Sequence, residues 1–269
     1  MSRPPRILLF DSGMGGLTVA AAVAQRLPQA ELFYCADSAG FPYGAWEEVT
    51  LIERILAVVG RAVARTLPDV CVVACNTAST IALNQLREIY PLPFVGTVPA
   101  IKPAAEQTRS GIIGVLATPA TVKREYTQGL IQAYAAQACV FLHGAARLAG
   151  MAEAKLKGEG VDLAELADEI APVFRIRGEA RTDCVVLGCT HYPLLAEEMK
   201  LAAPWEVSWI DPSPAIARRV ADVLARERLS EQGPSGAVKA GTVMFTDGKG
   251  AKNAAAYGPL FGRVEMLEV

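Results

Sequence analysis

The sequence has no cluster of lysine or arginine residues, no apolar run long enough to cross a membrane, and only two histidines. With a formal net charge of −2 over 269 residues, nothing in it would attract nucleic acid or an anionic membrane, so the expected partners are small solutes. The apolar run before Asp11 is four residues long, which is too short for the core of a secretory signal. We therefore expect a cytoplasmic protein that neither binds nucleic acid nor enters a membrane.

Six cysteines are present. In a chain of this size without an export signal they stay reduced, so they serve packing, metal binding or catalysis. A zinc site would have to use Cys71, Cys75, Cys184, Cys189 and His191. It is disfavoured, because the side chains of Cys71 and Cys75 would lie about 13 Å apart along a strand. No lysine has a recognisable Schiff-base context, and the only glycine-rich turn, 13–16, is short. We expect neither a metal nor a cofactor.

Apolar runs of strand length alternate with amphipathic helical patterns, which is typical of parallel α/β sheets flanked by helices. The predicted strands are 6–10, 31–36, 69–74, 94–98, 110–116, 138–142, 185–187, 207–210 and 242–245, the last being the final strand. The predicted helices are 17–27, 48–67, 79–90 with Ser79 or Thr80 as cap, 123–134, 148–174 with a break at 158–160, 193–203 and 216–228. Prolines 99, 103, 212 and 214 mark crossovers, and the breaker-rich stretch 231–236 predicts a loop.

Two stretches resemble each other closely. Residues 72–77 (VVACNT) and 185–191 (VVLGCTH) each place a cysteine after a strand-length apolar run and before polar residues and a helical pattern. Each cysteine should therefore lie at the carboxyl end of a strand and beside a helix amino terminus, where an anion is favoured and a thiolate becomes accessible. The duplication favours two domains and two matched reactive thiols.

Each candidate has a plainer interpretation. A single buried cysteine is usually structural, and Cys35, Cys71, Cys139 and Cys184 keep that interpretation, as does His143. The duplication and the polar residues that follow favour chemistry at Cys75 and Cys189. His191 follows Cys189 by two residues, which favours a catalytic role. Asp11 and Ser12 could merely cap a helix, and Asp37 and Tyr43 could merely form a turn.

Five motifs carry a family resemblance: residues 10–19 (FDSGMGGLTV), 36–37 (AD), 42–44 (PYG), 74–79 (ACNTAS) and 187–195 (LGCTHYPLL). Through them the chain resembles the glutamate racemases of the cofactor-independent aspartate/glutamate racemase family. The resemblance implies two pseudo-symmetric α/β domains, 1–98 plus 211–269 and 99–210, with mainly parallel sheets and an active site in the cleft between them. It also implies interconversion of L- and D-glutamate without a cofactor, supplying D-glutamate for bacterial peptidoglycan.

The resemblance assigns Cys75 and Cys189 as the two catalytic bases, with Asp11 and His191 guiding their protons. The implied substrate-binding residues are Asp11, Ser12, Pro42, Tyr43, Gly44, Cys75, Asn76, Thr77, Thr118, Thr121, Thr190 and His191. Two further candidates are Asp37 and Glu153, the latter as a partner of His191. The sequence departs from the commoner family pattern at 96–100, which lacks an acidic residue, and at 143–153, where a Cys-Pro-rich stretch is replaced.

Three rival functions remain open at this stage. The same chemistry could act on aspartate or another small amino acid. A cysteine hydrolase or redox protein would need only one reactive cysteine. A module that binds an amino acid or another protein would need neither thiol as a base. A homodimer is compatible with the sequence.

Overall fold

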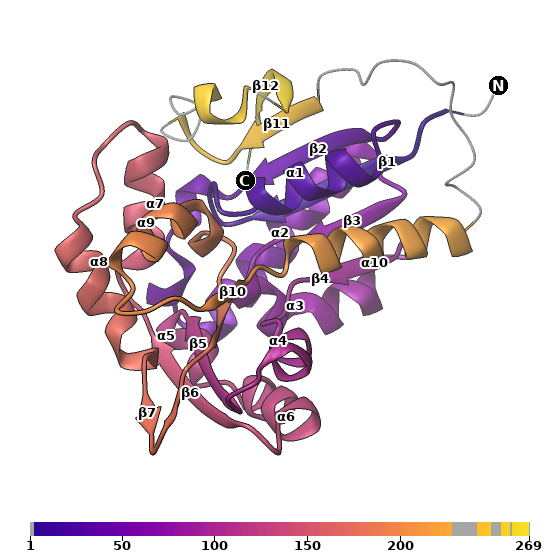
Figure 1. Ribbon diagram of the computed structural model, residues 1–269. Coiled ribbons are helices and arrows are strands. Elements are labelled where there is room, and N and C mark those ends of the chain that lie inside the picture. Colours follow the sequence, from indigo (N-terminus) through magenta and orange to yellow (C-terminus); the bar gives the residue numbers. More distant parts are fainter. Residues whose placement is uncertain (1–2, 228–240, 249–253, 259, 269) are drawn as a thin grey trace. The chain divides into compact units, whose positions relative to one another are not determined.

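The structure is a computed structural model that describes residues 3–227, 241–248, 254–258 and 260–268. The chain divides into two compact units (Figure 1). The first unit contains Met1–Thr97 and Ser213–Val269, and the second contains Val98–Pro212. The chain therefore passes between the units twice, at 97–98 and at 212–213.

The first unit is built on a parallel sheet in the order β12-β11-β2-β1-β3-β4. Its strands are β1 (Arg6–Asp11), β2 (Glu31–Ala36), β3 (Val70–Val73), β4 (Phe94–Gly96), β11 (Gly241–Phe245) and β12 (Phe261–Met266). The central strands are almost entirely buried, which explains why they are continuous apolar runs and not alternating ones.

Four helices cover this sheet: α1 (Leu17–Arg26), α2 (Glu48–Thr66), α3 (Asn76–Ile89) and α10 (Ser213–Arg226). Leu8 and Phe10 of β1 pack with α2 and α3 in one apolar cluster. The alternate side chains of the strands face the other way, where α1 and α10 lie against each other (Figure 1). Short 3₁₀ turns occupy Ser38–Gly40, Tyr43–Ala45 and Ala254–Tyr257.

The second unit has a parallel sheet in the order β10-β9-β5-β6. Its strands are β5 (Ile112–Ala117), β6 (Cys139–Gly144), β9 (Cys184–Gly188) and β10 (Ser208–Ile210), and β7 (Ile176–Arg177) and β8 (Ala180–Arg181) form a separate antiparallel pair. Its helices are α4 (Ile101–Gln107), α5 (Pro119–Val122), α6 (Glu125–Tyr134), α7 (Leu148–Leu156), α8 (Leu163–Ile170) and α9 (Ala196–Ala202). Helices α7 to α9 pack on one face of the sheet, and α4 and α6 pack on the other. The predicted α/β class, with parallel sheets flanked by helices, is confirmed.

Three of the differences from the prediction have a plain physical cause. Helix α3 begins at Asn76, not after Ser79, because Ser79 binds the backbone of β3 instead of capping the helix. Helix α4 forms where a crossover was expected, since Pro103 lies in its first turn, where the missing N–H leaves no intrahelical bond unmade. Strand β12 follows the strand predicted to be the last; most of its side chains are exposed, so its apolar pattern is weak. The predicted loop at 231–236 lies outside the described residues.

None of the helices in the described ranges is long and apolar enough to span a lipid bilayer.

Candidate active site

Cys75 lies between the end of β3 and the first turn of α3. It is the N-cap residue of this 14-residue helix, with extended backbone angles (φ −136°, ψ 121°), and its carbonyl oxygen accepts a hydrogen bond of 2.9 Å from the N–H of Ser79. The first N–H groups of a helix have no partner inside the helix and carry partial positive charge. The Cys75 side chain makes no capping hydrogen bond of its own, so these N–H groups remain available to an anion next to the thiol.

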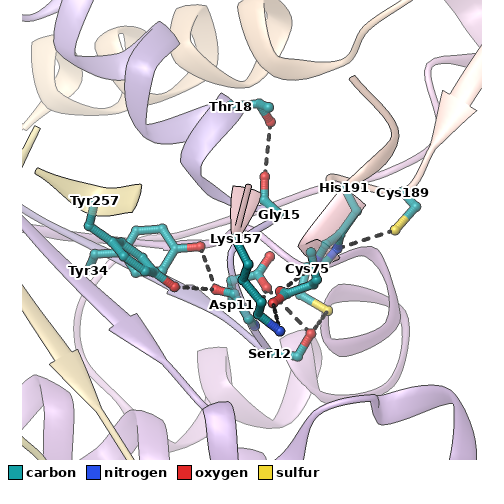
Figure 2. A network of polar contacts seen from close by, with 12 residues as sticks. Asp11, Ser12, Gly15, Thr18, Tyr34, Cys75, Lys157, Cys189, His191 and Tyr257 are labelled. Carbon is teal, nitrogen blue, oxygen red and sulfur yellow. Dashed lines mark hydrogen bonds and ion pairs between the residues drawn. The ribbon is translucent and has the colours of Figure 1, made fainter. Parts of the chain in front are cut away.

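A buried carboxylate lies close to Cys75 through a hydroxyl group (Figure 2). The Ser12 hydroxyl oxygen is 3.8 Å from the sulfur of Cys75 and 3.4 Å from Oδ1 of Asp11. The same Oδ1 accepts a hydrogen bond of 2.6 Å from the N–H of Gly13, and Asp11 is fully buried. Carboxylate, hydroxyl and thiol form a chain along which a proton can pass.

Two tyrosines hold the loop that follows Asp11. Tyr34 and Tyr257 both donate to the carbonyl oxygen of Gly13, at 3.0 and 3.2 Å (Figure 2). At Gly16, a Cβ atom would lie 2.6 Å from the Tyr34 hydroxyl and 3.0 Å from Cβ of Asp11, so only glycine allows this close approach. The sequence does not predict a role for either tyrosine. Tyr34 lies 21 positions and Tyr257 lies 244 positions from Gly13, so no local pattern links them to this loop.

The first turn of α3 contains a buried amide without an internal partner. Neither Oδ1 nor Nδ2 of Asn76 has a hydrogen-bond partner within the described part of the chain, although the residue is only 2% exposed. Leaving a buried polar group unpaired costs about 1–3 kcal/mol. Such a group is well placed to bind a polar ligand, and the neighbouring Thr77 is buried beside it.

The 42–44 segment follows β2 and belongs to the same unit as Cys75. Tyr43 packs in the apolar cluster that contains Cys75, and its hydroxyl donates to Asp37 at 2.6 Å. Burial, together with the negative charge of Asp37, raises the pKa of the Tyr43 hydroxyl well above its ordinary value, so this phenol stays protonated. A Cβ atom added at Gly44 would meet nothing within 4 Å, so the end of the segment that follows Pro42 is open.

The second unit places an imidazole and a carboxylate next to Cys189. Nδ1 of His191 lies 3.8 Å from the sulfur of Cys189, and its Nε2 lies 3.1 Å from Oε1 of Glu153 on α7 (Figure 2). The other carboxylate oxygen of Glu153 is 3.9 Å from the ammonium of Lys157, four residues on. A thiol, an imidazole and a carboxylate in this order can activate a cysteine, since the imidazole takes the proton and the carboxylate orients it. Lys157 was missed, although its spacing from Glu153 is that of a helical ion pair.

Three threonines lie at the carboxyl ends of β5 and β9, which pair through Ala117 and Gly188. Thr118 caps the short helix α5, accepts a hydrogen bond of 3.2 Å from the N–H of Thr121, and lies 2.9 Å from its hydroxyl. Thr190, between the cysteine and the histidine, is 1% exposed. The second unit therefore gathers its predicted site residues at one sheet edge.

The remaining cysteines differ from these two. Cys35, Cys71 and Cys184 are buried in strands, and burial raises the pKa of all three thiols, that of Cys184 to about 11. They are protonated near neutral pH, which agrees with a packing role. Cys139, on the edge strand β6, is only partly buried and has the Arg177 guanidinium 2.9 Å from its sulfur. Among the residues that the structure describes, no group of three His, Cys, Asp or Glu side chains could hold a metal ion.

Comparison with known proteins identifies the family. The sequence profile of the family described as Asp/Glu/Hydantoin racemase matches residues 17–220. A glutamate racemase of Brucella anthropi is 53% identical over 227 residues, covering 84% of this chain and 82% of the relative. A crystal structure of the Escherichia coli glutamate racemase in complex with L-glutamate and the activator UDP-MurNAc-ala is 40% identical, with a TM-score of 0.89 and 99% of each chain covered. A structure of the Francisella tularensis glutamate racemase in complex with D-glutamate is 25% identical, with a TM-score of 0.78 over 99% of this chain and 98% of that one. The chain therefore belongs to the Asp/Glu/hydantoin racemase family.

Proposed function

We propose that this protein interconverts L- and D-glutamate in the cytoplasm, with Cys75 and Cys189 as the two bases, and supplies D-glutamate for peptidoglycan synthesis. The similar proteins from Brucella anthropi and Escherichia coli are both glutamate racemases. One observation supports the chemistry most directly. Each unit holds a thiol at the carboxyl edge of its parallel sheet, and each thiol is linked through one polar group to a buried carboxylate.

Inversion at Cα requires a base and an acid on opposite sides. The Cα–H of an amino acid is a very weak acid, so the proton must leave to a well-placed base while another proton arrives on the other face. If one cysteine starts as the thiolate and the other as the thiol, a single turnover inverts the Cα centre and exchanges the protonation states of the two cysteines. The substrate does not have to turn over. This requirement explains why two matched cysteines are present.

The family resemblance implies which enantiomer each thiol serves: we assign Cys75 to the proton of D-glutamate and Cys189 to that of L-glutamate. In both directions of the reaction, Asp11 and Ser12 pass protons to and from Cys75, and Glu153 and His191 do the same for Cys189. A neutral His191 takes the proton of the Cys189 thiol and returns it, while Glu153 fixes the orientation of the ring. Because these two sets of groups differ, the rates of the two half-reactions should depend differently on pH.

The substrate carboxylates need donors that are already in place. Asn76, Thr77 and Thr190, with the N–H groups at the start of α3, hold the α-carboxylate and stabilise the charge that develops on it as the Cα proton leaves. The remaining predicted binding residues surround the rest of the substrate; they are Ser12, Pro42, Tyr43, Gly44, Thr118 and Thr121. The unpaired Asn76 amide supports this assignment, since a ligand oxygen and a ligand N–H group would satisfy both of its polar atoms.

The test uses purified protein, L-glutamate and no additives, with optical rotation as the measurement. Rotation should decay to zero at equal concentrations of the two enantiomers, and it should do so at the same rate after dialysis against a chelator. A panel that includes L-aspartate and L-alanine tests the choice of substrate. Binding without racemisation would favour an amino-acid-binding module, and complete loss of turnover on chelation would contradict the cofactor-free mechanism.

A further inference from the structure

Asp37 is a completely buried carboxylate that accepts four hydrogen bonds. Tyr43 donates to Oδ2 at 2.6 Å, and Thr246, which follows β11, donates to Oδ1 at 2.8 Å. Arg54 of α2 donates twice, from Nε to Oδ2 at 2.7 Å and from Nη2 to Oδ1 at 2.5 Å. Both oxygens are therefore fully engaged inside the protein, so Asp37 has no lone pair facing a substrate.

Arg54 is held in place on its other sides as well. Its guanidinium carbon lies 5.4 Å from the ring centroid of Trp46, and Trp46 donates to the carbonyl oxygen of Gly40 at 2.8 Å. A Cβ atom at Gly40 would lie 2.6 Å from Nε of Arg54, 2.6 Å from Oδ2 of Asp37 and 2.9 Å from the Tyr43 ring. The backbone at Gly40 thus approaches the three side chains so closely that no larger residue fits at this position.

The fork geometry of Arg54 explains why this cation is needed. A planar guanidinium can bond both oxygens of one carboxylate at once, which fixes the orientation of the carboxylate as well as its charge. The Tyr43 hydroxyl has only one proton, and it is given to Asp37. The direction of the Tyr43 side chain therefore depends on where Arg54 holds Asp37.

We propose that Arg54 is a positioning residue for the racemisation: it fixes the Asp37 carboxylate, and through the Asp37–Tyr43 hydrogen bond it sets the position of the 42–44 segment of the substrate site. This role rests on the proposed function, which places Tyr43 and Gly44 next to the substrate. Arg54 touches neither the substrate nor a reacting atom. Its effect is carried by Asp37, which explains why Asp37 stands next to the site without being free to bind a ligand.

The test compares Arg54→Met and Arg54→Lys with a control on the same helix, Arg61→Met. Arg61 is exposed and forms no ion pair with any residue that the structure describes. The measurements are KM and kcat for each enantiomer, the unfolding temperature, and amide hydrogen exchange over residues 38–46. Removing Arg54 leaves a buried carboxylate without its cation. If Arg54→Met does not stay folded, Arg54→Lys, which keeps the charge but loses the fork, supplies the same comparison.

For Arg54→Met we expect KM to rise about tenfold or more for both enantiomers, with kcat changed by less than about threefold, because ligand positioning is lost while the thiols stay in place. Exchange should quicken at 38–46 but not in β3. Arg54→Lys should be intermediate, and Arg61→Met should match the wild type. The double variant Arg54→Met/Tyr43→Phe should have a KM less than about twofold higher than that of the worse single variant. Both substitutions interrupt the same series of hydrogen bonds from Arg54 through Asp37 to Tyr43.

Each outcome decides between the claims. If the effects of Arg54→Met and Tyr43→Phe multiply, or if Arg54→Met keeps the KM and the exchange protection of the control, the positioning role is wrong. A wild-type protein that does not racemise glutamate contradicts the proposed function instead. In that case faster exchange at 38–46 in the Arg54 variants still establishes that Arg54 orders this segment, and unchanged exchange overturns that as well.

Discussion

Cys75 and Cys189 have different neighbours, although each follows a buried strand, and single substitutions should separate their roles. Replacing either by serine should lower the rate of inversion at least about 100-fold, because a serine hydroxyl is too weakly acidic to serve as the base. Each variant keeps one thiol. In deuterium oxide, Cys75→Ser should still exchange the Cα proton of L-glutamate, and Cys189→Ser that of D-glutamate, both measured by NMR.

The wild type provides the reference for this experiment. Starting from L-glutamate, newly formed D-glutamate should contain solvent deuterium at Cα, because the returning proton comes from the opposite thiol. Cys139→Ser is the control, since Cys139 is a partly exposed cysteine outside the proposed site, and it should keep the wild-type rate. Exchange of the same enantiomer by both single variants would show that the assignment of one thiol to each face is wrong.

The unpaired amide of Asn76 predicts a trade between stability and activity. Asn76→Leu removes a buried polar group that has no internal partner, so the free energy of unfolding should be unchanged or higher by up to about 2 kcal/mol. KM should rise for both enantiomers, because the ligand loses a donor and an acceptor. Ser79→Ala is the contrasting variant: Ser79 donates to Val73 and accepts from Thr97, so its loss should lower stability by about 1–3 kcal/mol. Thermal unfolding and initial rates measure both effects. Lower stability for Asn76→Leu would mean that its amide is satisfied within the protein.

At this scale, the residues that could be predicted are those with a local signal. Cys75 and Cys189 could be proposed as site residues because their surroundings repeat, and His191 because it follows Cys189 closely. Arg54 could not, because its partner Asp37 lies 17 positions away across two 3₁₀ turns, and a lone arginine on an amphipathic helix resembles any solvated residue. Thr246, 209 positions from Asp37, has no sequence signal at all.

Among the elements, the buried strands were predicted well because each is a continuous apolar run. Helix starts were harder. Ser79 and Thr80 are the residue types that cap helices, but Cys75 takes the N-cap position, and Ser79 is used to tie α3 to β3. Strand β12 and helix α4 were missed because exposure in one case and Pro103 in the other mask the usual pattern.

Asp183, which immediately precedes β9, should make the stability of the second unit depend on pH. Its carboxylate accepts hydrogen bonds from the Thr108 hydroxyl at 2.6 Å and from the N–H groups of Arg109 and Ser110 at 2.7 and 2.9 Å. Partial burial alone would raise the pKa of Asp183, but these hydrogen bonds outweigh it and lower the pKa from its ordinary value. A lowered folded-state pKa means that the stabilisation is present above the unfolded-state pKa and is lost as the pH falls through the folded-state pKa.

Asp183→Asn should therefore destabilise the protein at neutral pH by about 1–3 kcal/mol. The difference from the wild type should shrink as the pH falls below about 4, the pKa range of an unfolded aspartate. Urea unfolding at pH 7 and pH 3 measures this. Asp168→Asn, at an exposed position in the same unit, should be neutral at both values. An equal loss of stability for Asp183→Asn at both pH values would contradict the charge-based explanation.

Over the whole molecule, the two sheets share one plan. The order β2-β1-β3-β4 in the first unit corresponds to β6-β5-β9-β10 in the second. Asp11 ends β1 and Thr118 follows β5, its counterpart, while Cys75 and Cys189 follow β3 and β9. The duplicated motif in the sequence was enough to predict this repeat. It could not predict that β11 and β12 extend the first sheet beyond β2, because nothing in the second half corresponds to them.

The two chain crossings, at 97–98 and 212–213, should respond together to substrate. If residues of both units hold one glutamate molecule, as proposed, ligand binding restrains the two segments that join the units, and water is excluded from the reacting groups. Amide exchange at Val98, Ala100 and Asp211 should slow in saturating glutamate; Pro99 and Pro212 have no N–H to report. Glycine at the same concentration is the control, because it lacks the side-chain carboxylate. The buried strands β1 and β5, whose amides are already protected, should not change. Exchange that stays the same in both segments at saturating glutamate would mean that the substrate binds without restraining the crossings, and slowing in only one would mean that the units are not drawn together as a pair.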